Sequence, residues 1–288
     1  MQTLFGPSGN SESFFAEGNK TTLQAPQWVK ERGLDAFEYS FGRGYIMPTE
    51  TAKKIGEEFK KYDIKLSLHA PYFINFASPD EVLLGKTRGY ITTGIKFLRA
   101  FGADRLVFHP ASCGKAERKE AFEIAKARIV EFVNSLDDQG LLEGLYLCPE
   151  TMGKTMQIGT YEEVLDICKE SPHLIPTFDF GHINALSQGS LKTKDDFKKI
   201  LEKSIEVIGY EKTNMAHIHF SKIQFGDKGE IRHLNFDDQI YGPNFEPLAE
   251  ALIELNLHPR ILSESAGHMA EDAAEMKRIY KKLLAEQK

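Results

Sequence analysis

Short apolar runs alternate with amphipathic segments along the whole chain. Within residues 116–136, Phe122, Ala125, Ile129 and Phe132 recur at helical intervals, so one face of a helix would be apolar. The apolar runs between such segments are short and nearly continuous, as expected for strands of a parallel sheet that is buried on both faces. The pattern predicts strands at residues 3–5, 34–40, 64–69, 105–109, 145–150, 174–179, 216–220 and 260–264. It predicts helices at residues 26–32, from Pro48 and Thr49 onward, in a long segment that ends at Gly102, and at residues 116–136, 161–169, 194–208, 246–255 and 270–284.

Eight strand–helix pairs in unbroken succession predict an α/β fold, a single-domain (β/α)8 TIM barrel over residues 1–288. A doubly wound open sheet is the alternative architecture for the same alternation. No linker, low-complexity tract or internal boundary interrupts the pattern. In such a barrel the active site lies at the C-terminal ends of the strands, so residues far apart in the chain would meet at one mouth.

The composition is that of an ordinary soluble protein, with 41% hydrophobic and 27% charged residues. No apolar run approaches the roughly 18 residues of a membrane span, and we expect no signal peptide. The three cysteines have no paired spacing, which favours a reducing, cytoplasmic location. The net charge of −6 argues mildly against binding of nucleic acid by bulk electrostatics, although bound cations and a local basic cluster would make one face positive.

Most of the predicted strands stop on a residue type that binds metal ions. These residues are His69, His109, Glu150, Asp179, His217 and Glu264, with His182 three positions after Asp179. Imidazole nitrogens and carboxylate oxygens together suit zinc, manganese or iron, whereas magnesium and calcium prefer oxygen alone. The set holds more ligands than one ion uses, so a central carboxylate such as Glu150 would bridge two ions about 3.5–4 Å apart. His173, His258 and His268, which lie beside prolines or in a loop, are interpreted as structural.

Longer matches surround these candidate ligands. They are His69-Ala70-Pro71-Tyr72-Phe73-Ile74-Asn75, Phe108-His109-Pro110-Ala111-Ser112, Glu150-Thr151, the loop that contains Gly159, Asp179-x-x-His182, His217 with Lys222-x-x-Phe225-Gly226, and Glu264-Ser265. With this ordered set, the chain resembles endonuclease IV, the apurinic/apyrimidinic endonuclease (family 2) of the xylose-isomerase-like TIM-barrel group. The matches run from the third predicted strand to the eighth, so the resemblance covers most of the chain. The ordered set is specific, whereas each motif singly is not.

The resemblance implies a zinc-dependent enzyme of DNA base excision repair. Such an enzyme hydrolyses the backbone of double-stranded DNA 5′ to an apurinic or apyrimidinic site and leaves a 3′-hydroxyl. Up to three zinc ions are implied, with manganese or iron as substitutes. The implied ligands are His69, His109 and the bridging Glu150 for the first ion, Glu150, Asp179, His217 and Glu264 for the second, and His182 and His233 with a carboxylate for the third. Glu150 and Glu264 are the candidate catalytic residues, and Tyr72 and Phe73 match the loop that inserts into the DNA minor groove.

The chain departs from the family pattern at two places. The family has an aspartate two residues before the histidine that corresponds to His233, where this chain has Ile231; Glu230 is the adjacent substitute. After the second predicted strand, the family carries a basic, aromatic loop that enters the DNA, and this chain has Glu38 and, further on, Arg43. A glutamate on the second strand is more typical of sugar isomerases and epimerases on the same barrel. We retain Arg43 as a candidate contact to phosphate.

Two other functions remain open at the level of sequence. A sugar or sugar-phosphate isomerase or epimerase would use one divalent ion and the carboxylate pair Glu150 and Glu264 for proton transfer. Such an enzyme needs Asp179 and His217 as further ligands, so the other histidines would be surplus, and this favours the nuclease. A non-catalytic homologue that binds damaged DNA is the third hypothesis. No membrane and no obligate protein partner is indicated.

Overall fold

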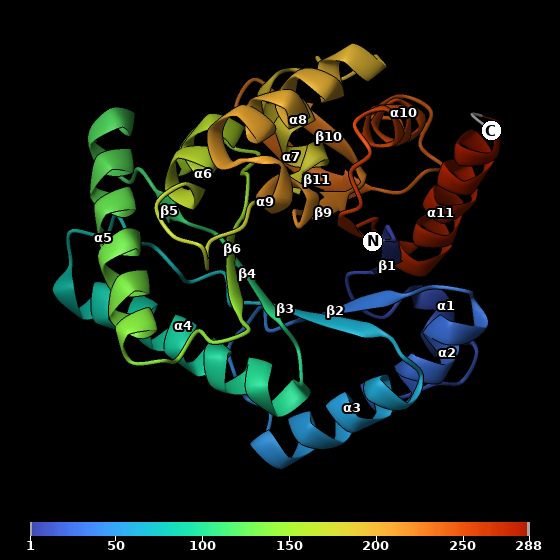
Figure 1. The fold of residues 1–288 in the computed structure, drawn as a ribbon, viewed down its shortest axis with the longest axis horizontal. Helices are drawn as coiled ribbons and strands as arrows, with labels where there is room; N and C mark the ends of the chain where they lie inside the picture. Colours follow the sequence, from blue (N-terminus) through green and yellow to red (C-terminus); the bar gives the residue numbers. More distant parts are fainter. Residues whose placement is uncertain (1, 287–288) are drawn as a thin grey trace.

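Eight parallel strands curve around one axis, and helices cover them from the outside (Figure 1). The computed structural model describes residues 2–286. The barrel strands are β1 (Leu4–Pro7), β2 (Ala36–Ser40), β3 (Lys65–His69), β4 (Arg105–Phe108), β6 (Tyr146–Pro149), β8 (Thr177–Asp179), β9 (His217–Phe220) and β12 (Arg260–Ser263). The predicted (β/α)8 TIM barrel is therefore confirmed.

Helices follow the strands as the amphipathic segments predicted, with ends that differ by only a few residues. They are α2 (Ala25–Glu31), α3 (Thr49–Lys61), α4 (Glu81–Phe101), α5 (Arg118–Asp138), α6 (Tyr161–Cys168), α8 (Lys194–Ile208), α10 (Glu246–Glu254) and α11 (Met269–Glu286). Short helical turns that the sequence pattern did not predict are α1 (Glu12–Ala16), the 3-10 turn η1 (Thr22–Gln24), α7 (Phe180–Leu186) and α9 (Tyr210–Asn214). Within residues 2–286, no helix has the length and apolarity needed to cross a membrane.

The barrel closes where two four-stranded halves meet. One half has the order β1-β12-β9-β8 and the other β2-β3-β4-β6. A parallel bridge joins Glu150 to Thr177 at one seam. At the other seam the Asp35 amide donates to the Phe5 carbonyl oxygen at 2.8 Å. Gly6 allows this approach, because a Cβ there would lie 1.8 Å from the carbonyl oxygen of Ala36.

Two small antiparallel ladders extend the C-terminal end of the barrel. β10 (Lys222–Gly226) pairs with β11 (Gly229–Leu234) as a hairpin directly after β9. β5 (Ala111–Ser112) pairs with β7 (Gln157–Ile158) in the loops after β4 and β6. The sequence pattern predicted only loops in these places, because the segments are too polar or too short to give a strand signal.

The apolar core lies between the strands and the surrounding helices. Outward-facing strand residues carry it: Phe37 of β2 packs on Phe59 of α3 with ring centroids 5.0 Å apart. Phe220 of β9 meets Phe245, which precedes α10, at 5.2 Å. Residues that alternate with these aromatics face the barrel interior and are polar, as Glu38 beside Phe37 illustrates. The strands are buried on both faces, but only the outer face is apolar throughout.

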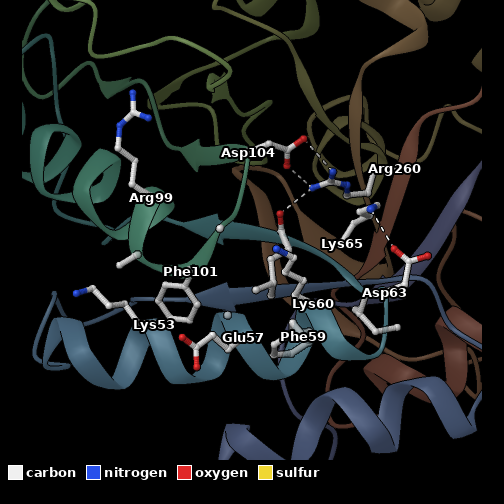
Figure 2. Close-up of a pocket in the computed structure, with 15 residues that line it drawn as sticks. Lys53, Glu57, Phe59, Lys60, Asp63, Lys65, Arg99, Phe101, Asp104 and Arg260 are labelled. Carbon is white, nitrogen blue, oxygen red and sulfur yellow. Dashed lines mark hydrogen bonds and ion pairs between the residues drawn. The ribbon is translucent and has the colours of Figure 1, made fainter.

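Ion pairs close the opposite, N-terminal end of the barrel. A cavity of about 550 Å³ lies there between α3 and α4, and Figure 2 shows its lining residues. Arg260 donates to both carboxylate oxygens of Asp104 at 2.9 and 3.1 Å and to the carbonyl oxygen of Leu66 at 3.0 Å. This network serves stability, because chemistry in a TIM barrel is located at the other end of the strands.

We predict that Asp104→Asn destabilises the protein by about 1–3 kcal/mol, because the buried Arg260 guanidinium loses its counter-charge. Arg260 and Arg105 lower the pKa of Asp104, which burial alone would raise. The stabilisation is therefore present above the pKa of Asp104 in the unfolded chain and is lost as the pH falls through its folded value. Urea unfolding of the wild type and of Asp104→Asn from pH 6 to pH 3 measures this dependence. A difference in the free energy of unfolding that is the same at every pH would contradict the prediction.

We predict that Gly56→Ala in α3 destabilises the protein by about 1–3 kcal/mol. A Cβ at this position would lie 2.2 Å from the carbonyl oxygen of Phe101, at the end of α4, so the two helices must separate. Gly85→Ala in α4 is the control, because its Cβ would meet no described atom within 4 Å and alanine stabilises an open helix position by up to about 1 kcal/mol. Thermal unfolding of the two variants should shift in opposite directions.

Candidate metal centre

Side chains from six barrel strands converge at the C-terminal mouth. They are His69 at the end of β3, His109 after β4, Glu150 after β6, Asp179 at the end of β8, His219 in β9 and Glu264 after β12. Parallel strands end on one side of a barrel, so the strand direction alone brings these distant residues together. His182 and the hairpin β10–β11 add further polar groups beside them.

Glu150 is the centre of this group. Its Oε2 lies 3.1 Å from His69 Nε2 and 3.2 Å from His109 Nε2. Its Oε1 lies 3.1 Å from His219 Nδ1, on the other side of the carboxylate. Glu150 is buried and touches two different sets of nitrogen donors, which is the position that a bridging carboxylate requires.

A second set of ligand atoms comes from Glu150, Asp179, His219 and Glu264, all within 4.8 Å of one another. His219 Nδ1 lies 3.4 Å from Glu264 Oε1. Asp179 is fully buried; its Oδ1 accepts the backbone N–H of His182 at 2.6 Å. Its Oδ2 has no hydrogen-bond partner among the described residues, so this oxygen remains available to a cation.

His219, and not His217, occupies the place beside Asp179 and Glu264. Both histidines face the barrel interior, because side chains two positions apart share one face of a strand. His217 begins β9 and lies one layer deeper, where its Nε2 is 3.1 Å from Glu38 Oε2. His217 therefore does not lie in the set with Asp179 and Glu264, where we expected it, but in a separate set of possible ligands with Glu38 and His219. The His-x-His spacing was the available signal, since the later residue is nearer to the C-terminal end of the strand.

A third set comprises Asp179, His182 and His233. Glu230 lies beside it, with Oε2 3.5 Å from His182 Nε2 and Oε1 4.0 Å from His233 Nε2. Residues three apart in a regular strand face opposite sides, but the hairpin register shifts between Gln224 and Phe225, so that Ile231 is an extra residue. Ile231 is exposed, whereas Glu230 and His233 both face the mouth. The structure thus places Glu230 beside this third set, and its role as the substitute carboxylate stays a prediction.

Backbone and hydroxyl groups orient three of the histidines. The Nδ1 atoms of His69 and His182 lie 2.8 and 2.9 Å from the carbonyl oxygens of Ala70 and Thr151. His233 Nδ1 lies 2.8 Å from Ser221 Oγ. When Nδ1–H donates to a carbonyl oxygen, the Nε2 lone pair is left for a metal ion, and such partners fix both the tautomer and the ring orientation.

The electrostatics of the mouth favour cations. Burial raises the pKa of Asp179 well above its ordinary value, and the neighbouring Glu264 and Glu150 raise it further. Burial alone would also raise the pKa of Glu150, but His219 and the other histidines hold it low. Burial would lower the pKa of His69, yet the Glu150 carboxylate raises it to about 9. A proton on Asp179 itself and positive charge on the histidines around Glu150 therefore balance these carboxylates, and bound metal ions would balance them directly.

The donor set fits divalent metal ions of the zinc type. Imidazole nitrogens and carboxylate oxygens are mixed in each group, and the unpartnered Asp179 Oδ2 is directed at the same space. Within residues 2–286, these mouth carboxylates form ion pairs with histidines, and Glu230 also lies 3.8 Å from Lys154. Zinc, manganese and iron all accept this combination of ligands.

An aromatic ring covers one side of the centre. The Tyr72 ring lies 5.6 Å from that of His69 and 5.4 Å from that of His109. Phe73 faces away from the histidines, toward Tyr90 of α4 at 6.1 Å, and 60% of it is exposed. Arg43 lies exposed on the loop after β2, next to Gly42, whose carbonyl oxygen accepts the Tyr72 amide at 3.5 Å. The three expected substrate contacts thus gather on one side of the mouth, with different orientations.

The three histidines interpreted as structural lie outside these groups. His173 pairs with Asp137 at 3.0 Å, and His268 lies 3.5 Å from Asp237. His258 contacts Thr3 near the start of β1. Glu38 was expected only as a departure from the nuclease pattern; the structure places it beneath His219, fully buried. No spacing in the sequence indicates that contact, because strands β2 and β9 are not neighbours in the barrel.

The fold and this mouth define the class of protein. The chain belongs to the xylose isomerase-like TIM barrel family, whose model matches residues 26–283. Over 284 residues it is 34% identical to an uncharacterized protein of Methanocaldococcus jannaschii, covering 98% of both chains. It is 28% identical over 288 residues to a probable endonuclease 4 of Listeria monocytogenes serotype 4b, covering 92% of this chain and 89% of that protein.

Solved structures with the same fold divide between two activities. A D-tagatose 3-epimerase-like protein superposes with a TM-score of 0.70 at 24% identity, over 91% of this chain and 93% of its own. Endonuclease IV from Thermus thermophilus superposes with a TM-score of 0.65 at 19% identity, over 93% and 96%. At such identities the likeness shows the shared fold.

We predict that the protein binds more than one divalent ion per chain and that Glu150→Gln reduces the bound number by more than one, because Glu150 contributes to two ligand groups. Elemental analysis after dialysis with zinc measures the stoichiometry. Asp104→Asn, the same carboxylate-to-amide change at the opposite end of the barrel, should leave it unchanged. A stoichiometry of one in both the wild type and Glu150→Gln would contradict the shared role of Glu150.

Proposed function

We propose that the protein is a metal-dependent phosphodiesterase that cleaves the DNA backbone 5′ to apurinic or apyrimidinic sites and leaves a 3′-hydroxyl. The observation that carries the proposal is the sharing of carboxylates: Glu150 belongs to two ligand groups and Asp179 to two. An arrangement of adjoining sites is the kind used for in-line displacement at phosphorus. The full-length similarity to a probable endonuclease 4 supports the same conclusion.

The three groups would share two carboxylates and serve one common function. His69, His109 and Glu150 would hold one ion; Glu150, Asp179, His219 and Glu264 would hold the second; Asp179, His182, His233 and Glu230 would hold the third. Such ions, most simply zinc, would lower the pKa of a water molecule and neutralise charge on the phosphate. The chain itself fixes the ligand geometry through the carbonyl contacts of His69 and His182.

The residues around the mouth would position the DNA. Tyr72 covers His69 and His109 from the side of the β3 loop, so its ring would limit the access of water and contact an exposed sugar or base. Phe73, in the loop after β3, and Ile231, in strand β11, are exposed apolar side chains. Arg43 would contact a backbone phosphate. Apolar side chains of this kind insert between base steps in proteins that bind the minor groove.

A sugar epimerase is the second candidate function, and a specific observation favours it. Glu150, Asp179, His219 and Glu264 alone form a complete group for one ion, with Glu150 and Glu264 available for proton transfer. The structural similarity to a D-tagatose 3-epimerase-like protein agrees with it. This function gives no role to the group of His69 and His109, which is why we place the phosphodiesterase first.

We predict that the zinc-loaded protein incises a DNA duplex that carries one tetrahydrofuran abasic analogue, with a product end that a DNA polymerase extends. His109→Ala should abolish the incision, because it removes a ligand from the group that only the phosphodiesterase requires. The matched control is His173→Ala, whose ring lies on the outside of the barrel against Asp137. The same duplex without the analogue should remain intact.

The competing outcome is equally specific. Turnover of a ketohexose by the protein loaded with manganese or zinc, without incision and with His109→Ala still active, would show the epimerase and overturn our proposal. Metal binding without either activity would favour a non-catalytic homologue.

A further inference from the structure

The interior of the barrel contains a buried polar cluster directly beneath the candidate metal centre. Glu38 of β2, Ser67 of β3, and His217 and His219 of β9 form it, and all four side chains are fully buried. His219 is also a ligand in the candidate metal centre, whereas Glu38, Ser67 and His217 have no role in the function proposed above. It is also costly to bury, because a carboxylate out of contact with water needs charged or hydrogen-bonding partners.

We infer that Glu38 is a positioning residue that holds His219 in the tautomer and orientation that directs Nδ1 into the metal centre. His219 Nε2 lies 2.9 Å from Glu38 Oε1 on the inner side of the ring. Its Nδ1 lies 3.1 Å from Glu150 and 3.4 Å from Glu264 on the outer side. The inference rests on the proposed metal centre and adds a residue to its support.

The contacts of Glu38 favour this role over that of a simple structural carboxylate. Ser67 Oγ donates to Oε2 at 2.9 Å, and His217 Nε2 lies 3.1 Å from the same oxygen. These two neighbours occupy Oε2, so Oε1 is left for His219. Among the described residues, neither His219 Nε2 nor Glu38 Oε1 has a hydrogen-bond partner, and the 2.9 Å ion-pair contact brings these two atoms together.

A carboxylate behind a metal-binding histidine acts on the metal through the ring. With a proton on Nε2 facing Glu38, the lone pair of His219 is on Nδ1, and the negative charge behind the ring makes that nitrogen a stronger ligand. Without Glu38, the proton on Nε2 would face no acceptor, and the ring would gain the freedom to rotate or to change its tautomer. The loss of Glu38 would lower the affinity for the second ion, to which Asp179 and Glu264 would both bind.

The test is the affinity of the purified full-length protein for Co²⁺ and Zn²⁺, measured by competition with a chromophoric chelator. Glu38→Gln keeps the size of the side chain but replaces one acceptor oxygen by an amide donor. We expect the affinity of one ion to fall about 10–100-fold, the usual effect of removing an outer partner of a metal ligand, while the number of ions at saturation stays constant. The visible spectrum of the bound Co²⁺ should change as the His219 ligand is displaced.

Asp104→Asn is the matched control for lost stability, since it alters a carboxylate near the opposite end of the same barrel. It should lower the unfolding temperature without changing either affinity or spectrum. Equal metal affinities in Glu38→Gln and the wild type would overturn the inference. A drop of one in the saturating stoichiometry would also overturn it, because Glu38 would then be a ligand, with His217 and His219, of an ion of its own.

The readout separates this inference from the proposed function. Metal affinity is measured without DNA or sugar, so a protein that binds metal but incises no abasic duplex would refute the phosphodiesterase and leave the role of Glu38 intact. A wild-type protein that binds no divalent ion would refute both.

Discussion

The burial of carboxylates at the barrel mouth is the constraint on which the rest of the site depends. Glu150 and Asp179 are almost fully removed from water; imidazoles surround Glu150, whereas Asp179 accepts the backbone N–H of His182 and lies 3.6 Å from the ring of that residue. A buried carboxylate is stable only when it takes up a proton or faces a positive charge. Asp179 follows the first course, since its pKa is raised, while Glu150 follows the second among its histidines. Divalent ions would supply positive charge to both carboxylates at once.

Different parts of the barrel serve stability and chemistry. Aromatic side chains between the strands and the helices, such as Phe37 against Phe59, form the apolar core on the outside of the sheet. The network of Asp104 and Arg260 closes the N-terminal end of the barrel. The inner faces of the strands can therefore carry polar residues toward the mouth. Polar residues on that face leave the packing of the apolar layer on the outer face intact and open no cavity in it.

The two candidate activities share the inner group of ligands and differ in what surrounds it. Asp179, His219 and Glu264 with Glu150 would serve either reaction. The group of His69 and His109 and the hairpin after β9 are the parts of the site that only the phosphodiesterase would use. The geometry of the hairpin depends on one extra residue, since the bulge at Ile231 turns Glu230 and His233 to the same side. Glu230 therefore lies beside His182 and His233, one position before the place where the family has the aspartate.

The amino-acid pattern was sufficient to predict the fold and most of the mouth. Alternating apolar runs and amphipathic segments define eight strand–helix pairs, and parallel strands must end together, so His69, His109 and Glu150 had to converge. Asp179 and His182 stay together because they are close in the chain, at the start of one short helix.

The choice of the histidine that reaches the mouth depended on three-dimensional packing, since His217 and His219 share one face of β9 and differ in depth alone. The same packing places Glu38 behind His219 and turns Glu230 inward. These contacts join strands that are not neighbours or follow from a change of register, and neither leaves a periodic signal in the chain.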